Sequence, residues 1–235
     1  MITSEVALWA WLPTYLLKIQ AVDMVSVKYL EELGRHRLSS NFFLRDFLHS
    51  EISQIEGMGN IPVDPELLLK AGSHLCEHVL EPIQARLGKV SIRSGYRSPS
   101  INQVGNEKNY NCASNEKNHA RHIWDVPDAS GNFGATACVV VNAFVDHYEA
   151  TGDWTVLGWW LLDNVPDFRD VVFFPKLAAF NINWYSGRVT QRTISAQMRD
   201  PRTGKKGILT RTGWDNFEGN HDQLYQEWVR SLDRV

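Results

Sequence analysis

Histidines and carboxylates that could bind a metal gather in two short stretches of the chain. NHARHIWDVPD at residues 118–128 contains His119, His122, Asp125 and Asp128, and EGNH at residues 218–221 contains Glu218 and His221. Imidazole and carboxylate groups bind zinc, and a glutamate can deprotonate a nearby water. If the loop before Gly134 folds back, His122, Asp128 and His221 could chelate zinc. Glu218 would then be the general base.

The same residues also have a purely structural interpretation. Pro127 separates His122 from Asp128 on an expected loop, while Glu218 and His221 fall where a helix is expected to begin. Side chains of these types commonly cap helices and form local hydrogen bonds. The sequence leaves both interpretations open.

A second histidine pair lies within a predicted helix. His74 and His78 are four residues apart, which places both rings on one helix face. The order HLCEH differs from the HExxH zinc motif, and no third ligand is nearby. We therefore expect a partly exposed helix face here.

Cys138 lies in GNFGATACVVV, residues 131–141, which predicts a strand buried on both faces. A nucleophilic cysteine needs an exposed, electropositive setting, whereas a buried neutral thiol behaves as a small hydrophobic group. The three cysteines, Cys76, Cys112 and Cys138, form no CxxC pair, so neither a disulfide framework nor a thiolate zinc site is predicted.

Several elements are predicted from periodicity and from residues that start or stop helices. Residues 39–51 read as an amphipathic helix capped by Ser39, Ser40 or Asn41, with Phe43 and Phe47 one turn apart. A second helix begins at Asp64 and Pro65 and ends at Gly88, with Leu68, Leu75 and Val79 facing inward. We also expect a strand from residue 90, a helix after residue 141, a hairpin within 188–214, and a helix from about Asp215 to Leu232.

The amino terminus contains the most apolar stretch, residues 6–22. No basic residue precedes Lys18, which argues against a signal peptide, and Pro13 interrupts a run already short for a membrane span. We interpret residues 1–37 as an N-terminal hydrophobic helical segment that packs on the body or on a partner, and residues 38–235 as the main domain.

Overall composition excludes several classes of function. The net charge is -3 and the basic residues are scattered, so no nucleic-acid partner is predicted. No nucleophile elbow, Walker loop or dinucleotide fingerprint occurs. The nine tryptophans suit a core or a permanent interface within an assembly.

The order of NFFLRDFLHSE, NIP and LCEHVLEPIQARLGKVSIRSGYRSPSIN resembles the N-terminal half of the M15-type zinc D-Ala-D-Ala peptidases, which include bacterial carboxypeptidases and phage endolysins. The resemblance covers roughly residues 38–200. It implies an α+β fold with a small antiparallel sheet flanked by helices. It also implies that Arg97, with Asn102, grips a peptide carboxylate, for which a guanidinium fork is well shaped. An Arg97 that only ties its own turn together is the structural alternative.

The zinc ligands implied by the resemblance are missing from the expected positions. The family pattern is a His, then Gly-x-Ala-x-Asp, and later a strand with His-x-Asp. Aligned on Gly134, these positions hold Gly131, Cys138 and, on the later strand, Ser195 and Gln197. Because a catalytic zinc needs three protein ligands and an open position, these residues do not supply a site.

We therefore expect a non-catalytic M15 peptidase-like protein without a cofactor, acting as a structural or cell-wall-contacting part of a phage particle such as a tail, baseplate or connector. Its partners would be other virion or assembly proteins and peptidoglycan peptides. The expected localisation is the virion, or otherwise the cytoplasm. Two alternatives remain: a zinc-dependent peptidoglycan peptidase, and a soluble peptide-binding module that uses Arg97 and Asn102 without chemistry.

Overall fold

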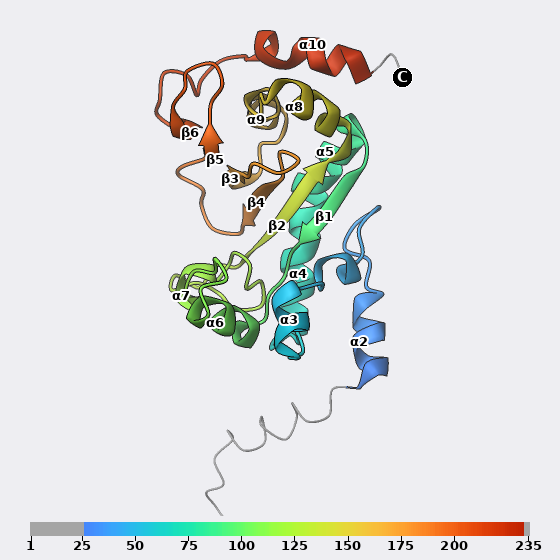
Figure 1. The fold of residues 1–235 in the computed structure, drawn as a ribbon. Coiled ribbons are helices and arrows are strands. Elements are labelled where there is room, and N and C mark those ends of the chain that lie inside the picture. Colours follow the sequence, from blue (N-terminus) through green and yellow to red (C-terminus); the bar gives the residue numbers. More distant parts are fainter. Residues whose placement is uncertain (1–25, 233–235) are drawn as a thin grey trace, which may run out of the picture.

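A computed structural model describes residues 26–232 as an α+β structure built on one six-stranded sheet. The strand order is β1-β2-β4-β3-β5-β6. Helices α6 and α7 lie beyond one end of strands β1 and β2, and helices α8, α9 and α10 lie beyond the other end (Figure 1). The predicted α+β class with flanking helices is confirmed.

The elements follow one another along the chain with these bounds: α2 Val27–Gly34, η1 Leu44–Phe47, α3 Glu51–Glu56, α4 Pro65–Leu75, η2 Cys76–Leu80, α5 Glu81–Leu87, β1 Val90–Ser94, α6 Pro99–Glu107, α7 Asn115–Asn118, β2 Gly134–Val141, η3 Asn142–Phe144, α8 Val145–Thr151, α9 Thr155–Asn164, β3 Phe168–Phe173, β4 Phe180–Tyr185, β5 Thr193–Arg199, β6 Lys206–Arg211 and α10 Asp222–Leu232.

The sheet is larger than predicted and is mixed rather than antiparallel. Strands β3 and β5 pair in parallel, while the other neighbouring strands pair antiparallel. The reason is topological. Strand β4 lies between β2 and β3, so the chain leaving β4 passes to the far side of β3 and enters β5 in the direction of β3. The predicted hairpin is present as β5 and β6.

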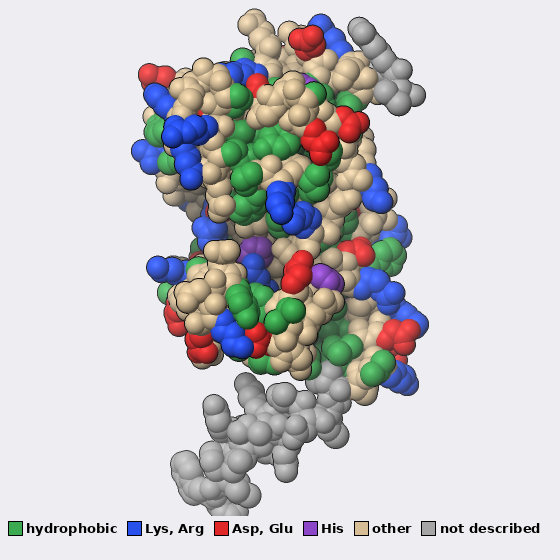
Figure 2. Space-filling view, in the orientation of Figure 1, with side chains coloured by type: hydrophobic (Ala, Val, Ile, Leu, Met, Phe, Trp, Pro, Cys, Tyr) green, Lys and Arg blue, Asp and Glu red, His purple; other side chains and the backbone are tan. Residues whose placement is uncertain are grey.

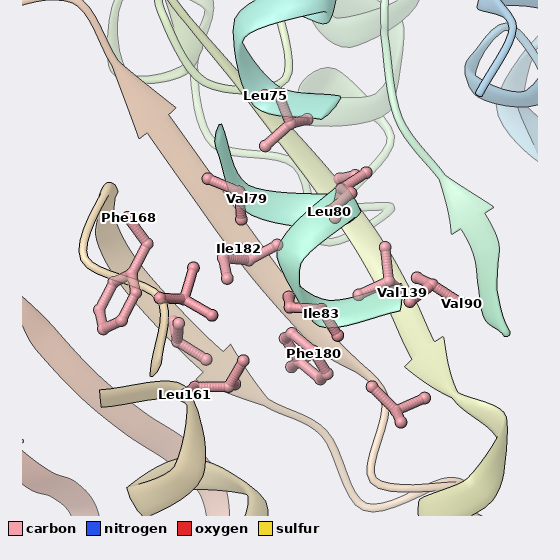
Figure 3. Packing of buried hydrophobic residues seen from close by; sticks show 14 of the residues in the cluster. Leu75, Val79, Leu80, Ile83, Val90, Val139, Leu161, Phe168, Phe180 and Ile182 are labelled. Atoms are coloured by element: carbon pink, nitrogen blue, oxygen red, sulfur yellow. The ribbon is translucent and has the colours of Figure 1, made fainter. Parts of the chain in front are cut away.

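The long helix predicted from Asp64 to Gly88 is confirmed, with one local change. The Asp64 side chain accepts hydrogen bonds from the backbone N–H groups of Glu66 and Leu67, and Gly88 ends the helix with φ of 78°. Residues Cys76–Leu80 form a π-helical turn between α4 and α5. Figure 3 shows the inner side of this helix packed over β1, β2 and β4.

Strand β2 is buried along its whole length, as predicted. Ala137 and Val139 belong to the main core between the sheet and helices α4, α5 and α9. Cys138 and Val140 point to the opposite face and form a smaller cluster with Ala179. The two faces of β2 therefore pack against different groups of residues.

Two predicted helix boundaries are wrong. The stretch predicted as one helix, residues 39–51, contains only the short helix η1 before Glu51, the first residue of α3, because the Ser39 side chain donates to Glu81 instead of capping a helix. The next helix, α3, is capped by Ser50. The C-terminal helix begins at Asp222, because Asn216 is held to β6 through hydrogen bonds with Leu209 and Thr210.

The predicted N-terminal segment is described only in part. Residues 6–22 lie outside the described residues, and residues 27–34 form α2 behind an N-cap at Ser26. Within residues 26–232, none of the helices has the length and apolar character needed to cross a membrane.

Replacing Phe47 with Ala tests the packing below β1. Phe47 is fully buried and its ring centroid lies 5.3 Å from that of Trp124. We expect Phe47→Ala to lower the free energy of unfolding by about 3–5 kcal/mol in denaturant titrations. The matched control Phe43→Ala, at a ring that is 41% exposed, should cost only about 1 kcal/mol. Equal losses would contradict the described packing.

Candidate functional site

Three side chains lie close together on the face of the sheet opposite the main core, where β1, β2 and β4 are neighbours. Cys138 on β2 is directly opposite Asn181 on β4 and pairs with Ser94 on β1. Directly opposite residues in antiparallel strands place their side chains on the same face. The third member is His122, whose Nε2 atom lies 3.3 Å from Nδ2 of Asn181.

His122 reaches this face from the loop before β2 and is held in one orientation. Its Nδ1 atom lies 2.9 Å from the carbonyl oxygen of Gly95. A carbonyl only accepts, so Nδ1 carries the proton and Nε2 is left to accept from Asn181. Burial, with a smaller effect from the Arg97 charge, lowers the pKa of His122 to about 3. The imidazole is therefore neutral at physiological pH.

Cys138 is also neutral. Burial raises the pKa of the thiol, and the nearby charges of Arg93 and Arg97 only partly oppose this effect. The side chain packs with Val140 and Ala179 rather than facing open solvent. A raised thiol pKa is unsuited to a nucleophile, which needs the thiolate.

Arg97 brings the positive charge to the edge of this cluster. Its backbone N–H donates to the His122 carbonyl oxygen over 2.8 Å, and its Nη1 donates to Asn102 and to the Cys112 sulfur. Both side-chain acceptors are uncharged, and no carboxylate among residues 26–232 lies within ion-pair distance of this guanidinium. The charge of Arg97 is fixed in place without being neutralised.

Arg97 lines a cavity of about 420 Å³ between α3 and the end of β1. Its lining includes the apolar side chains of Ile52 and Ile55 and the ring of Tyr110. Figure 2 shows this face of the molecule hollowed across its middle, where basic, acidic and histidine side chains come together. The lining also includes His49 and the carboxylate of Glu51, so the cavity combines an apolar wall with one guanidinium and one carboxylate.

Asn102 holds the Arg97 side chain in place by accepting a hydrogen bond from it. It is fully buried, and its Nδ2 donates to the Ala113 carbonyl oxygen and to Asn115, while its Oδ1 also accepts from Asn118. Asn102 is not among the residues that line the cavity. It therefore acts as a positioning residue for Arg97.

The structure does not bring the predicted metal ligands His122, Asp128 and His221 together. Asp128 accepts from Tyr185 and from the N–H groups of its own turn, whereas His221 is bound to Asp163 at 2.7 Å. Glu218 lies on an exposed loop after β6. Within residues 26–232, no group of three or more His, Cys, Asp or Glu side chains is close enough to hold a metal ion.

Gly131 and Ser195 also lie away from Cys138. Gly131 is in an exposed turn with φ of 78°. Ser195 is on β5, which is separated from β2 by β4 and β3, and its hydroxyl donates to the Val171 carbonyl oxygen. Sequence reasoning missed Asn181, although FNINW, with polar residues alternating with apolar ones on a strand, carries the signal.

His74 and His78 form an aromatic stack instead of a metal site. The His74 ring lies 4.5 Å from that of Trp184, nearly parallel to it, and 5.4 Å from that of His78. The two rings pack α4 and η2 against Trp184 of β4.

Thiol labelling tests the burial of Cys138. Cys76 and Cys138 are buried, whereas Cys112 is partly exposed. We expect Ellman's reagent to modify one thiol rapidly in the folded protein, and Cys112→Ser to remove that rapid reaction. Cys138→Ser should leave it unchanged. Rapid loss of the Cys138 thiol in the folded protein would contradict a buried, neutral thiol.

The pH dependence of stability tests the environment of His122. Its pKa in the folded protein, about 3, is below the value of about 6.5 expected when unfolded, so the unfolded chain binds more protons between these values. The free energy of unfolding should therefore fall as the pH drops below about 6.5.

His122→Asn keeps a donor for the Gly95 carbonyl and removes the titrating group. We expect the stability advantage of the native protein over this variant to shrink on acidification, by at most about 1.4 kcal/mol per pH unit. Parallel stability curves for the two proteins would mean that the folded imidazole titrates normally.

Comparisons with known proteins do not add an identity to this site. No protein-family model, curated protein or solved structure matches the chain. The function must therefore be inferred from the arrangement of these residues and from the sequence resemblance.

Proposed function

We propose that the protein is a non-catalytic M15 peptidase-like protein that contacts the cell wall by binding a peptide carboxylate at Arg97. The observation that carries the proposal is the guanidinium of Arg97, which lines a cavity, is held by uncharged acceptors and has no carboxylate partner among the described residues. A fixed, uncompensated guanidinium suits a carboxylate ligand, which it can bind through two parallel hydrogen bonds.

The surroundings of Arg97 favour binding without chemistry. His122 and Cys138 are both neutral, and the Glu51 carboxylate that lines the cavity makes no ion pair with Arg97, so the guanidinium stays available to a carboxylate ligand. The apolar wall formed by Ile52, Ile55 and Tyr110 can receive an uncharged side chain next to that carboxylate. These features fit the end of a peptidoglycan stem peptide.

The M15-like interpretation also argues against catalysis by a bound metal. The aligned ligand positions are Gly131, Cys138 and Ser195, and the side chains that lie near Cys138 in the structure are instead His122 and Asn181. A carboxamide binds zinc poorly, and the Cys138 thiol is held in its protonated form. The donor set does not fit a catalytic zinc.

A role inside a phage particle follows from the resemblance to a family with phage-encoded members. A protein that holds a wall peptide without cutting it suits a tail, baseplate or connector, where contact with the wall must persist. Other virion proteins would be its partners in such a particle.

Cosedimentation with purified peptidoglycan sacculi tests the function. We expect the protein to pellet with sacculi and to release no soluble muropeptides. Arg97→Lys should weaken binding about tenfold, because lysine cannot make the paired hydrogen bonds. The control Arg93→Lys, at an exposed arginine of β1 that does not line the cavity, should bind normally.

Two outcomes would contradict the proposal. Muropeptide release that a chelator abolishes would indicate the alternative, a zinc-dependent peptidoglycan peptidase. Binding that is equally strong in Arg97→Lys would mean that the guanidinium only ties its own turn.

A further inference from the structure

A larger cavity, of about 760 Å³, lies away from Arg97 between the β5–β6 hairpin, helix α9 and the loop after β6. This volume is within the range of about 300–1,000 Å³ typical of small-molecule sites. None of the residues that line it lines the Arg97 cavity. It is therefore a separate candidate site.

The floor of this cavity is apolar and aromatic. Trp159, Leu209 and Leu224 contribute to it from α9, β6 and α10, and Ile208, which is exposed, contributes from the rim. Trp214 also lines the cavity and is 36% exposed. The Arg211 guanidinium lies 4.9 Å from the Trp214 ring centroid without lining the cavity, which leaves other parts of the ring for a ligand.

Polar groups that make no hydrogen bond to the rest of residues 26–232 surround this floor. They are the indole N–H groups of Trp159 and Trp214, the ammonium group of Lys205 and the carboxylate of Asp215. Both donors and acceptors are thus available. The charged side chains in the lining are Asp200, Arg202, Lys205 and Asp215, two of each sign, so the cavity does not select for a charged ligand.

The rim is held in place by hydrogen bonds within the protein. Arg202 donates to Asp153 over 2.9 Å, Thr203 donates to Asp200, and Asn216 donates to the Leu209 carbonyl oxygen. Figure 2 shows basic side chains gathered over this hairpin. A rim ordered before binding reduces the entropy lost when a ligand binds.

We infer that this cavity binds an uncharged saccharide. A sugar ring has an apolar face of C–H groups, which suits contact with the Trp214 ring and the apolar floor, and a rim of hydroxyls that both donate and accept. A ligand with a strong net charge would leave the opposite charges of the rim unsatisfied. A purely apolar ligand would bury the indole N–H groups without partners, which is costly.

The inference does not depend on the proposed peptide binding, since the two cavities share no residue. If the protein does contact the wall, this site would take the glycan while Arg97 takes the peptide. An experiment can therefore disprove either site without disproving the other.

Titration of the full chain with N,N′,N″-triacetylchitotriose and with cellotriose, followed by calorimetry, tests the saccharide site. We expect at least one of these neutral trisaccharides to bind, with an affinity that added salt leaves unchanged. Trp214→Ala should weaken binding about tenfold. Tyr110→Ala, at an exposed aromatic residue of the other cavity, and Arg97→Lys should bind the sugar normally.

Asp215→Asn provides a second variant with a minimal change of shape, and we expect it to weaken binding several-fold by removing an acceptor. Failure of both trisaccharides to bind would overturn the inference, as would binding unaffected by both variants. Sedimentation showing that the free protein dimerises, with Trp214→Ala abolishing the dimer, would assign the cavity to a second copy instead.

Discussion

The burial of β2 on both faces is the constraint on which the rest of the structure depends. Its main-core face needs only apolar neighbours, which α4 and α5 supply. Its other face carries Thr136 and Cys138 opposite the amide side chains of Asn183 and Asn181. Because buried polar groups must be hydrogen-bonded, the segment that covers this second face must supply hydrogen-bond partners.

The loop between α7 and β2 covers this face and supplies these partners. Asn183 donates to the carbonyl oxygens of Ala120 and Ala135 and to the Thr136 hydroxyl, and the Trp124 indole donates to the Thr136 carbonyl oxygen. Ala120 has φ of 55°, a left-handed conformation that is unfavourable for alanine and is retained because its carbonyl is needed here. His122 reaches Asn181 as a consequence of this folding.

The same loop fixes Arg97, through the hydrogen bond from its backbone to His122. A neutral imidazole, a neutral thiol and an uncompensated guanidinium therefore lie together for structural reasons. This arrangement suits the recognition of an anion. At the other end of the sheet, the β5–β6 hairpin builds a cavity of different chemistry, with balanced charges and two indole donors.

The elements whose signals are local could be predicted from the sequence. The Asp64 cap, the Gly88 stop, the buried run at β2 and the final hairpin all depend on neighbouring residues, and each was predicted correctly. Helix starts were misplaced where a potential cap, Ser39 or Asn216, bonds to a residue outside the expected helix instead. Local patterns cannot show such competition.

Which polar residues lie together depends on the tertiary structure. The choice of Asn181 rather than Ser195 as the neighbour of Cys138 depends on strand order, since β4 pairs with β2 whereas β5 lies beyond β3. The neutrality of His122 likewise depends on burial by residues distant in the chain. Strand pairing and burial depend on residues far apart in the chain. The spacing of motifs therefore could not predict which residues form this site.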